Sequence, residues 1–130
     1  MQISLPTLLA VGIGGFIGSI ARLYVTSICA VVFPPNLPYG TMIVNIGGSF
    51  IIGFLFAIFS ILETPIYVKS FLTTGFLGAL TTYSTFAIET FFLFNTNLAF
   101  ALVNIFVNLV GTIFAAGFGY KITLLVSRYF

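Results

Sequence analysis

The chain has 130 residues, of which 60% are hydrophobic and only 5% are charged, and its formal net charge is +2. Soluble globular domains carry about 25% charged residues, so this composition predicts an integral membrane protein and excludes the basic surface of a nucleic-acid-binding protein. The chain has no histidine and one cysteine, and its only acids are Glu63 and Glu89. It lacks the residues for a metal cluster or a nucleophile–base pair, so we expect no enzyme activity.

The first apolar segment covers about residues 5–33. No lysine or arginine precedes it, and it continues beyond the core of a signal peptide, so we expect a membrane span that stays in the mature protein. Two pairs of small residues lie four positions apart, Gly14 with Gly18 and Gly15 with Ser19. Small residues at this spacing let helix backbones approach closely in a bilayer.

Arg22 lies in the second half of this segment. An arginine at the bilayer centre costs several kcal/mol unless it reaches headgroups or finds polar partners. Two interpretations stay open: Arg22 anchors the helix at the membrane interface, or it attracts or gates ions.

The second apolar segment, about 40–62, follows a proline-rich stretch that cannot continue a helix. Its polar residues Thr41, Asn45 and Ser49 are spaced four apart and therefore share one helix face. An amide in hydrocarbon needs hydrogen-bond partners, because each unmet polar group costs several kcal/mol. The stripe predicts either polar contacts between helices or the lining of a pore.

The third apolar segment, about 66–94, contains the stretch GFLGALTTYSTF at 75–86. Gly75 and Gly78 weaken a helix there, and four hydroxyl residues surround Tyr83 and can bond to the backbone instead. We expect the third helix to be broken near the bilayer midplane, where freed backbone groups can face ions. The alternative is a continuous, closely packed, glycine-rich helix.

The fourth apolar segment, about 98–126, repeats the four-residue polar spacing with Asn104, Asn108 and Thr112. The whole chain, 1–130, is then one domain of four spans, and both termini lie on one side of the membrane. The basic residues on that side are Lys69, Lys121 and Arg128. This bias weakly favours cytoplasmic termini and leaves dual orientation open.

Three stretches together resemble a known family. Residues 40–53 read GTxxVNxxGSFxxG, residues 75–86 read GxxGxxTTYSTF, and residues 14–24 read GxxxGxxxRLY. These motifs are similar to the second, third and first helices of the bacterial fluoride channel family, Fluc or CrcB. The fourth segment is only loosely diagnostic.

The resemblance implies an all-α membrane protein that forms an antiparallel dual-topology dimer, with two fluoride pores and a central sodium ion. The sodium ligands would be the backbone carbonyls of Gly78 and Thr81. We expect the subunits to pair through Gly14, Gly18, Ser49 and the break in the third helix. The partner is a second copy or a paralogous subunit.

The resemblance also assigns pore residues. Tyr83 and Phe86 would be the aromatic pair, where the first position is usually Phe in the family. Other pore residues are a donor amide, a polar track and a hydroxyl donor: Asn45, Thr41, Asn108, Thr112 and Ser84. Glu89 maps to a vestibule. An aromatic ring edge is the positive part of the quadrupole and can face an anion.

The composition predicts a multi-pass membrane protein, and the resemblance implies that it lies in the inner (cytoplasmic) membrane, embedded in lipid, lets fluoride leave the cell passively and so gives fluoride resistance. Two alternatives remain. One is a small dimeric proton-coupled exporter, for which Glu89 is the embedded acid. The other is a non-conducting subunit of a heterodimeric channel, because the phenol of Tyr83 alters the expected pore wall.

Overall fold

The computed structural model describes residues 4–129. Four helical stretches are long and apolar enough to cross a membrane: Leu5–Val32, Tyr39–Ile61, Ile66–Thr96 and Leu98–Tyr129. The first two are the single helices α1 (Leu5–Val32) and α2 (Tyr39–Ile61). The prediction of an all-helical, multi-pass membrane protein is confirmed.

The third span contains four helical elements: α3 (Ile66–Ser70), the π-helical η1 (Phe71–Leu77), the short α4 (Gly78–Leu80) and α5 (Tyr83–Thr96). The two residues between α4 and α5 have extended dihedrals. A π-helical turn is wider than an α-helix and frequently lies at a functional site.

The fourth span has the elements α6 (Leu98–Phe106), the π-helical η2 (Val107–Gly111), α7 (Thr112–Val126) and the terminal 3-10 turn η3 (Ser127–Tyr129). Asn97 sets its start, because the side-chain Oδ1 accepts the N–H of Phe100 at 3.2 Å. Such a cap satisfies one of the backbone donors that a helix N-terminus leaves free.

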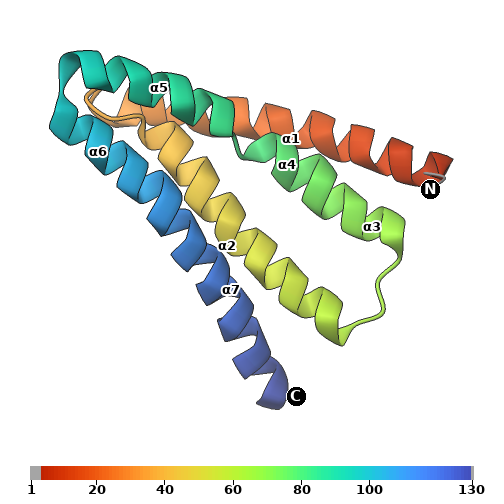
Figure 1. Cartoon of the computed structure of the whole chain (residues 1–130). Helices are drawn as coiled ribbons and strands as arrows, with labels where there is room; N and C mark the ends of the chain where they lie inside the picture. Colours follow the sequence, from red (N-terminus) through yellow and green to blue (C-terminus); the bar gives the residue numbers. More distant parts are fainter. Residues whose placement is uncertain (1–3, 130) are drawn as a thin grey trace.

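The helices diverge from one end of the molecule (Figure 1). The loop between α1 and α2 and the turn between α5 and α6 lie together at that end, and the two termini lie away from it. The first helix, α1, packs on η1 and α4, while α2 packs along α7 and α5 packs on α6. The junction of α4 and α5 thus carries the chain from one helix pair to the other.

Glycines allow the closest contact between α1 and the third span. A Cβ at Gly14 would meet the carbonyl oxygen of Phe71, and a Cβ at Gly18 would overlap the carbonyl of Phe76. Gly14 and Gly18 are therefore buried inside one subunit. The expectation that they pair two subunits was wrong, because the spacing of small residues indicates close packing without naming the partner helix.

The contact between α2 and α7 follows the same rule. A Cβ at Gly53 would overlap the carbonyl oxygen of Ala116, and a Cβ at Gly119 would overlap that of Phe50. These two contacts hold the backbones of α2 and α7 together, and they place the polar stripe of α2 beside that of the fourth span.

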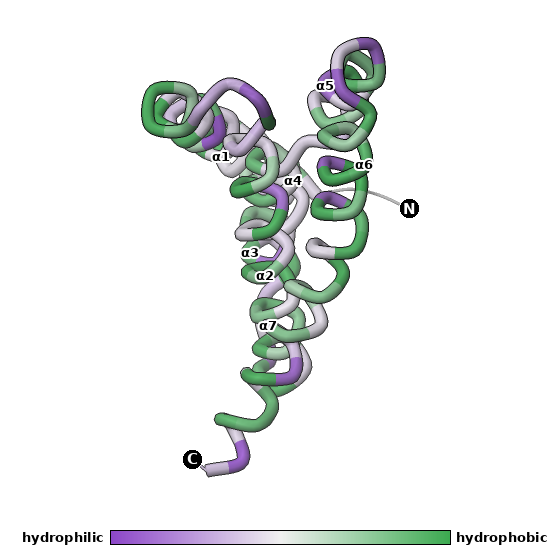
Figure 2. Tube along the Cα trace, turned by 90° about the vertical axis from the view of Figure 1, so that its left-hand side faces the viewer, coloured by the Kyte–Doolittle hydropathy of each residue, from purple (hydrophilic) through white to green (hydrophobic). Residues whose placement is uncertain are grey.

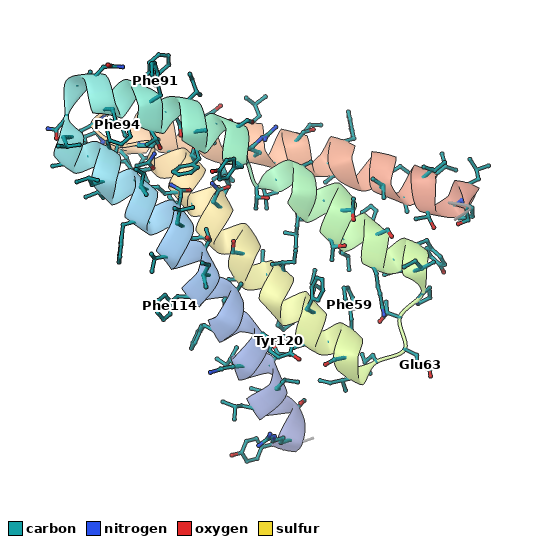
Figure 3. All side chains as sticks on the ribbon, in the orientation of Figure 1. Phe59, Glu63, Phe91, Phe94, Phe114 and Tyr120 are labelled. Atoms are coloured by element: carbon teal, nitrogen blue, oxygen red, sulfur yellow. The ribbon has the colours of Figure 1, made fainter. Side chains whose placement is uncertain are left out.

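The outer surface is strongly apolar. Figure 2 shows hydrophobic residues along most of each helix, and only 11% of the most apolar window of α1 is buried. Phe91 and Phe114 are exposed and point away from the helices (Figure 3). Phe59 instead points toward α3, where the Nζ of Lys69 lies 5.5 Å from its ring centroid. Such a surface suits a bilayer rather than water.

Candidate functional site

The site is built around Thr81 and Thr82. Thr81 has φ −80° and ψ 156°, and Thr82 has φ −149° and ψ 118°, so the backbone is extended at both. The helix resumes because Thr82 is the N-cap of α5: its Oγ1 accepts the N–H of Thr85 at 3.2 Å. A hydroxyl residue is well suited to this capping position.

Two backbone carbonyls lose their helical donors here. In a continuous α-helix, the N–H of Thr82 would donate to Gly78 and the N–H of Thr85 to Thr81. Instead, the N–H of Thr82 donates to Oδ1 of Asn45 at 2.8 Å, and the N–H of Thr85 donates to the Thr82 side chain. The carbonyl oxygens of Gly78 and Thr81 are therefore free of those two bonds.

Asn45 bridges α2 to this junction. Besides accepting from Thr82, its Nδ2 donates to the Thr82 carbonyl at 3.1 Å and to Oδ1 of Asn108 at 2.8 Å. Asn45 is buried. Both of its N–H groups thus have partners within the chain, although the resemblance assigned Asn45 to the pore as a donor amide.

Behind Asn45 the amide network continues into the fourth span. Nδ2 of Asn108 donates to the side-chain oxygen of Asn104 at 2.9 Å and to its carbonyl at 3.1 Å. Nδ2 of Asn104 donates to Oγ1 of Thr90 at 2.9 Å. Thr112 donates to the carbonyl of Asn108 at 2.6 Å. The polar stripes of α2 and the fourth span therefore meet in one network.

Two cavities meet at Thr82. A cavity of about 490 Å³ lies between α1, α2 and α5, and its lining includes Arg22, Thr41 and Glu89. A second cavity of about 270 Å³ lies between α2, the third span and the fourth span. Its lining includes most of the expected pore and sodium residues: Asn45, Gly78, Thr81, Tyr83, Phe86, Asn108 and Thr112. Thr82 is the one residue of the described chain that lines both cavities.

The expected site residues thus come together, with one exception. Ser84 lines neither cavity, although its hydroxyl lies 3.4 Å from that of Thr82. The sequence did not single out Thr82 as the junction, or Thr90 as a partner of Asn104. The four-residue spacing of Asn104, Asn108 and Thr112 marked Asn104 as a polar residue of the fourth span. No local pattern marks Thr90.

The aromatic pair lies at the second cavity. The rings of Tyr83 and Phe86 are 5.4 Å apart between centroids, with an interplanar angle of 66°. This edge-to-face arrangement is favourable for aromatic rings. Phe86 is only 6% exposed, whereas Tyr83 is 74% exposed. This chain therefore leaves the outer side of the Tyr83 ring uncovered.

Glu89 lines the first cavity, and one of its two carboxyl oxygens accepts a hydrogen bond. Its Oε1 accepts the hydroxyl hydrogen of Thr41 at 2.9 Å. Its Oε2 is the buried side-chain polar atom without a hydrogen-bond partner within residues 4–129. Glu89 and Arg22 line the same cavity, so an acidic and a basic side chain border it.

Fold and site define a small four-span membrane protein in which two partly polar cavities converge on one backbone junction. Residues 9–120 match the family model described as CrcB-like protein, Camphor Resistance (CrcB). The chain belongs to the CrcB family, as its motifs suggested.

Curated relatives from several organisms are similar over nearly their full length. A protein of Sulfurimonas denitrificans is 50% identical over 96% of this chain and 98% of its own. One from Nautilia profundicola is 48% identical over 88% of this chain and 91% of its own. One from Methanocaldococcus jannaschii is 46% identical over 93% of this chain and 97% of its own. Each of these three relatives is named fluoride-specific ion channel FluC.

Proposed function

We propose that this chain is a fluoride-selective channel that lets fluoride leave the cell passively across the cytoplasmic membrane. The observation that carries the proposal is the meeting of two cavities at Thr82, between α4 and α5. The names of the relatives support fluoride as the ion and a channel rather than an enzyme as the class.

Fluoride is small and strongly hydrated, so a selective path must replace lost water with hydrogen-bond donors. The first turn of α5 supplies backbone N–H groups, and the positive end of the helix dipole favours an anion there. Asn45 can donate to the ion only by releasing the Thr82 carbonyl or Asn108. Because Thr82 lines both cavities, the ion path runs from the first cavity past Thr82 to the aromatic pair Tyr83 and Phe86 in the second cavity.

The functional unit is an antiparallel dimer with both orientations present in the membrane, and the interruption in each third span lies near the bilayer midplane. Two features support a second subunit. Tyr83 borders a pore cavity yet is 74% exposed, and α1 keeps a wide apolar face. The partner is a second copy or a paralogue, and two pores follow from the symmetry of the pair.

A sodium ion at the dimer centre is part of the same proposal. The carbonyl oxygens of Gly78 and Thr81 fit it, because both lack the helical donors they would otherwise have. They also lie at the last turn of the helical stretch formed by α3, η1 and α4, where the helix dipole favours a cation. A bound cation would lower the cost of an anion nearby.

One observation favours a second candidate, a proton-coupled exporter. Glu89 has a buried carboxylate oxygen without a partner in residues 4–129, and it borders a cavity. Fluoride efflux from liposomes that hold only this chain, with and without an imposed proton gradient, separates the two. A channel gives efflux that follows the fluoride gradient, and Glu89→Gln leaves the gradient dependence unchanged. Efflux that stops without a proton gradient contradicts the channel.

A further inference from the structure

The hydrogen bonds behind the junction run in one direction. The N–H of Thr82 donates to Asn45, Asn45 donates to Asn108, and Asn108 donates to Asn104. Asn104 donates to Oγ1 of Thr90, whose hydroxyl donates to the carbonyl of Phe86 at 2.7 Å. Asn108 and Asn104 therefore each present an oxygen toward the junction and a nitrogen away from it, while Nδ2 of Asn45 donates both to Asn108 and back to the Thr82 carbonyl at 3.1 Å.

The two ends of this row fix the orientation of the amides between them. A backbone N–H can only donate, so Asn45 must present its oxygen to Thr82. A backbone carbonyl can only accept, so the Thr90 hydroxyl donates to Phe86 and can only accept from Asn104. A flipped amide anywhere in the row would set two donors or two acceptors against each other, which in a buried site costs free energy.

Thr90 and Asn104 take part in this row without touching the ion path. Asn104 is 0% exposed and Thr90 is 6% exposed. Neither residue lines either of the cavities that meet at Thr82, whereas Asn45 and Asn108 line the second cavity. Any effect of the Thr90 hydroxyl on conduction must therefore be transmitted through the amides.

We propose that Thr90 and Asn104 are positioning residues that, together with the backbone carbonyl of Asn104, keep the oxygen of Asn108 turned toward Asn45. The oxygen of Asn108 accepts one of the two N–H groups of Asn45, and Asn45 can exchange this bond for one to an anion at the junction. Without the Thr90 hydroxyl, Asn104 can flip and set its Nδ2 against that of Asn108. Asn108 then keeps only the Asn104 carbonyl as an acceptor, and its oxygen is held less firmly toward Asn45. This inference rests on the proposed fluoride conduction.

The test compares fluoride flux through Thr90→Val, Thr90→Ser and the native chain in liposomes, normalised to folded protein. Valine keeps the shape of threonine but cannot accept from Asn104. We expect flux through Thr90→Val to fall about tenfold, a barrier increase of about 1.4 kcal/mol. Thr90→Ser keeps the hydroxyl, so its flux should remain close to the native value.

Thr123→Val is the matched control. The hydroxyl of Thr123 donates to the carbonyl of Gly119 at 2.8 Å, as Thr90 does to Phe86, but no amide donates to it within the described chain. Flux should be unchanged. If Thr90→Val folds poorly, the double variant Thr90→Val/Asn104→Leu removes the unpaired amide and should show the same loss of flux.

Flux through the native chain in the same vesicles shows whether a negative result concerns fluoride conduction itself or only the positioning role of Thr90. If the native chain passes no fluoride, the proposed function fails and this inference fails with it. If the native chain conducts and Thr90→Val, or the double variant, conducts equally well, only the positioning role is wrong. Equal losses in Thr90→Ser and Thr90→Val would likewise overturn it, because the methyl packing and not the hydroxyl would then be responsible.

Discussion

At the scale of single residues, Phe86 and Tyr83 have different surroundings although they contact each other. Phe86 is buried, and Tyr83 is largely exposed. The positive edge of a buried ring is a fixed feature of the cavity wall. The hydroxyl of an exposed tyrosine can instead bond to water or to a neighbouring subunit. The two rings should therefore respond differently to substitution.

Phe86→Ile keeps an apolar side chain but removes the aromatic edge from the second cavity. We expect fluoride flux to fall about a hundredfold, which corresponds to a barrier increase of about 2.7 kcal/mol. Liposome efflux measures this, with elution of the purified variant as the check on folding.

Tyr83→Phe removes only a hydroxyl and keeps the ring. We expect it to preserve or increase flux, because the exposed hydroxyl has no hydrogen-bond partner that the described chain supplies. If Tyr83→Phe abolishes flux while Phe86→Ile leaves it intact, the assignment of these two side chains to the pore is wrong.

At the scale of elements, glycines decide which helices touch. Gly12 and Gly18 both lie on α1, but a Cβ at Gly12 would meet nothing within 4 Å, whereas at Gly18 it would overlap the backbone of Phe76. A backbone atom cannot move aside as a flexible side chain can. The difference gives a matched pair of variants on one helix.

Gly18→Ala should destabilise the protein by about 1–3 kcal/mol, the usual cost of overpacking. Gly12→Ala should be neutral or slightly stabilising, since alanine favours a helix more than glycine does. Thermal unfolding in detergent measures both. Equal melting temperatures for the two variants would mean that α1 and η1 do not pack as described.

Much of this architecture could be predicted from residue patterns. Apolar length alone indicated four spans, and the hydroxyl cluster beside Tyr83 pointed to the region where α4 ends and α5 begins. The partner of Gly18 could not be predicted, because a spacing marks a smooth helix face but not the helix that lies on it. The π-helical turns η1 and η2 were not predicted, because no residue pattern in the sequence analysis marked them.

The site was predictable to a similar depth. The polar stripes marked Asn45, Asn108 and Thr112 as residues that need partners but left helix contacts and a pore lining both open, and the family resemblance assigned them to the pore. Thr90 was not, because its partner Asn104 lies on the next helix and only the turn at Asn97 brings them together. The hydrogen bonds from Asn45 to the Thr82 carbonyl and to Asn108 could not be predicted either, because both partners lie on other spans.

At the scale of the whole molecule, the few charges leave orientation weakly specified. Basic residues outnumber acidic ones by only 4 to 2 over the chain, and a strong orientation needs a clear bias of lysine and arginine. A chain that inserts both ways supplies both members of an antiparallel pair without a second gene.

Orientation can be measured with Ser127→Cys in a Cys29→Ala background, labelled from outside intact cells, because this change leaves the charged residues in place. If the chain inserts both ways, an impermeant reagent should label about half of the protein. Complete labelling, or none before the membrane is opened, would indicate a fixed orientation and favour a heterodimer with an oppositely oriented paralogue.

Fluoride and chloride efflux from liposomes that hold only this purified chain tests the central claim most directly. The proposed path past Thr82 offers a few fixed donors rather than a wide aqueous lumen, so we predict rapid efflux of fluoride down its gradient and little efflux of chloride. Equal rates for the two anions, or no fluoride efflux from vesicles that contain folded protein, would contradict a self-sufficient fluoride channel.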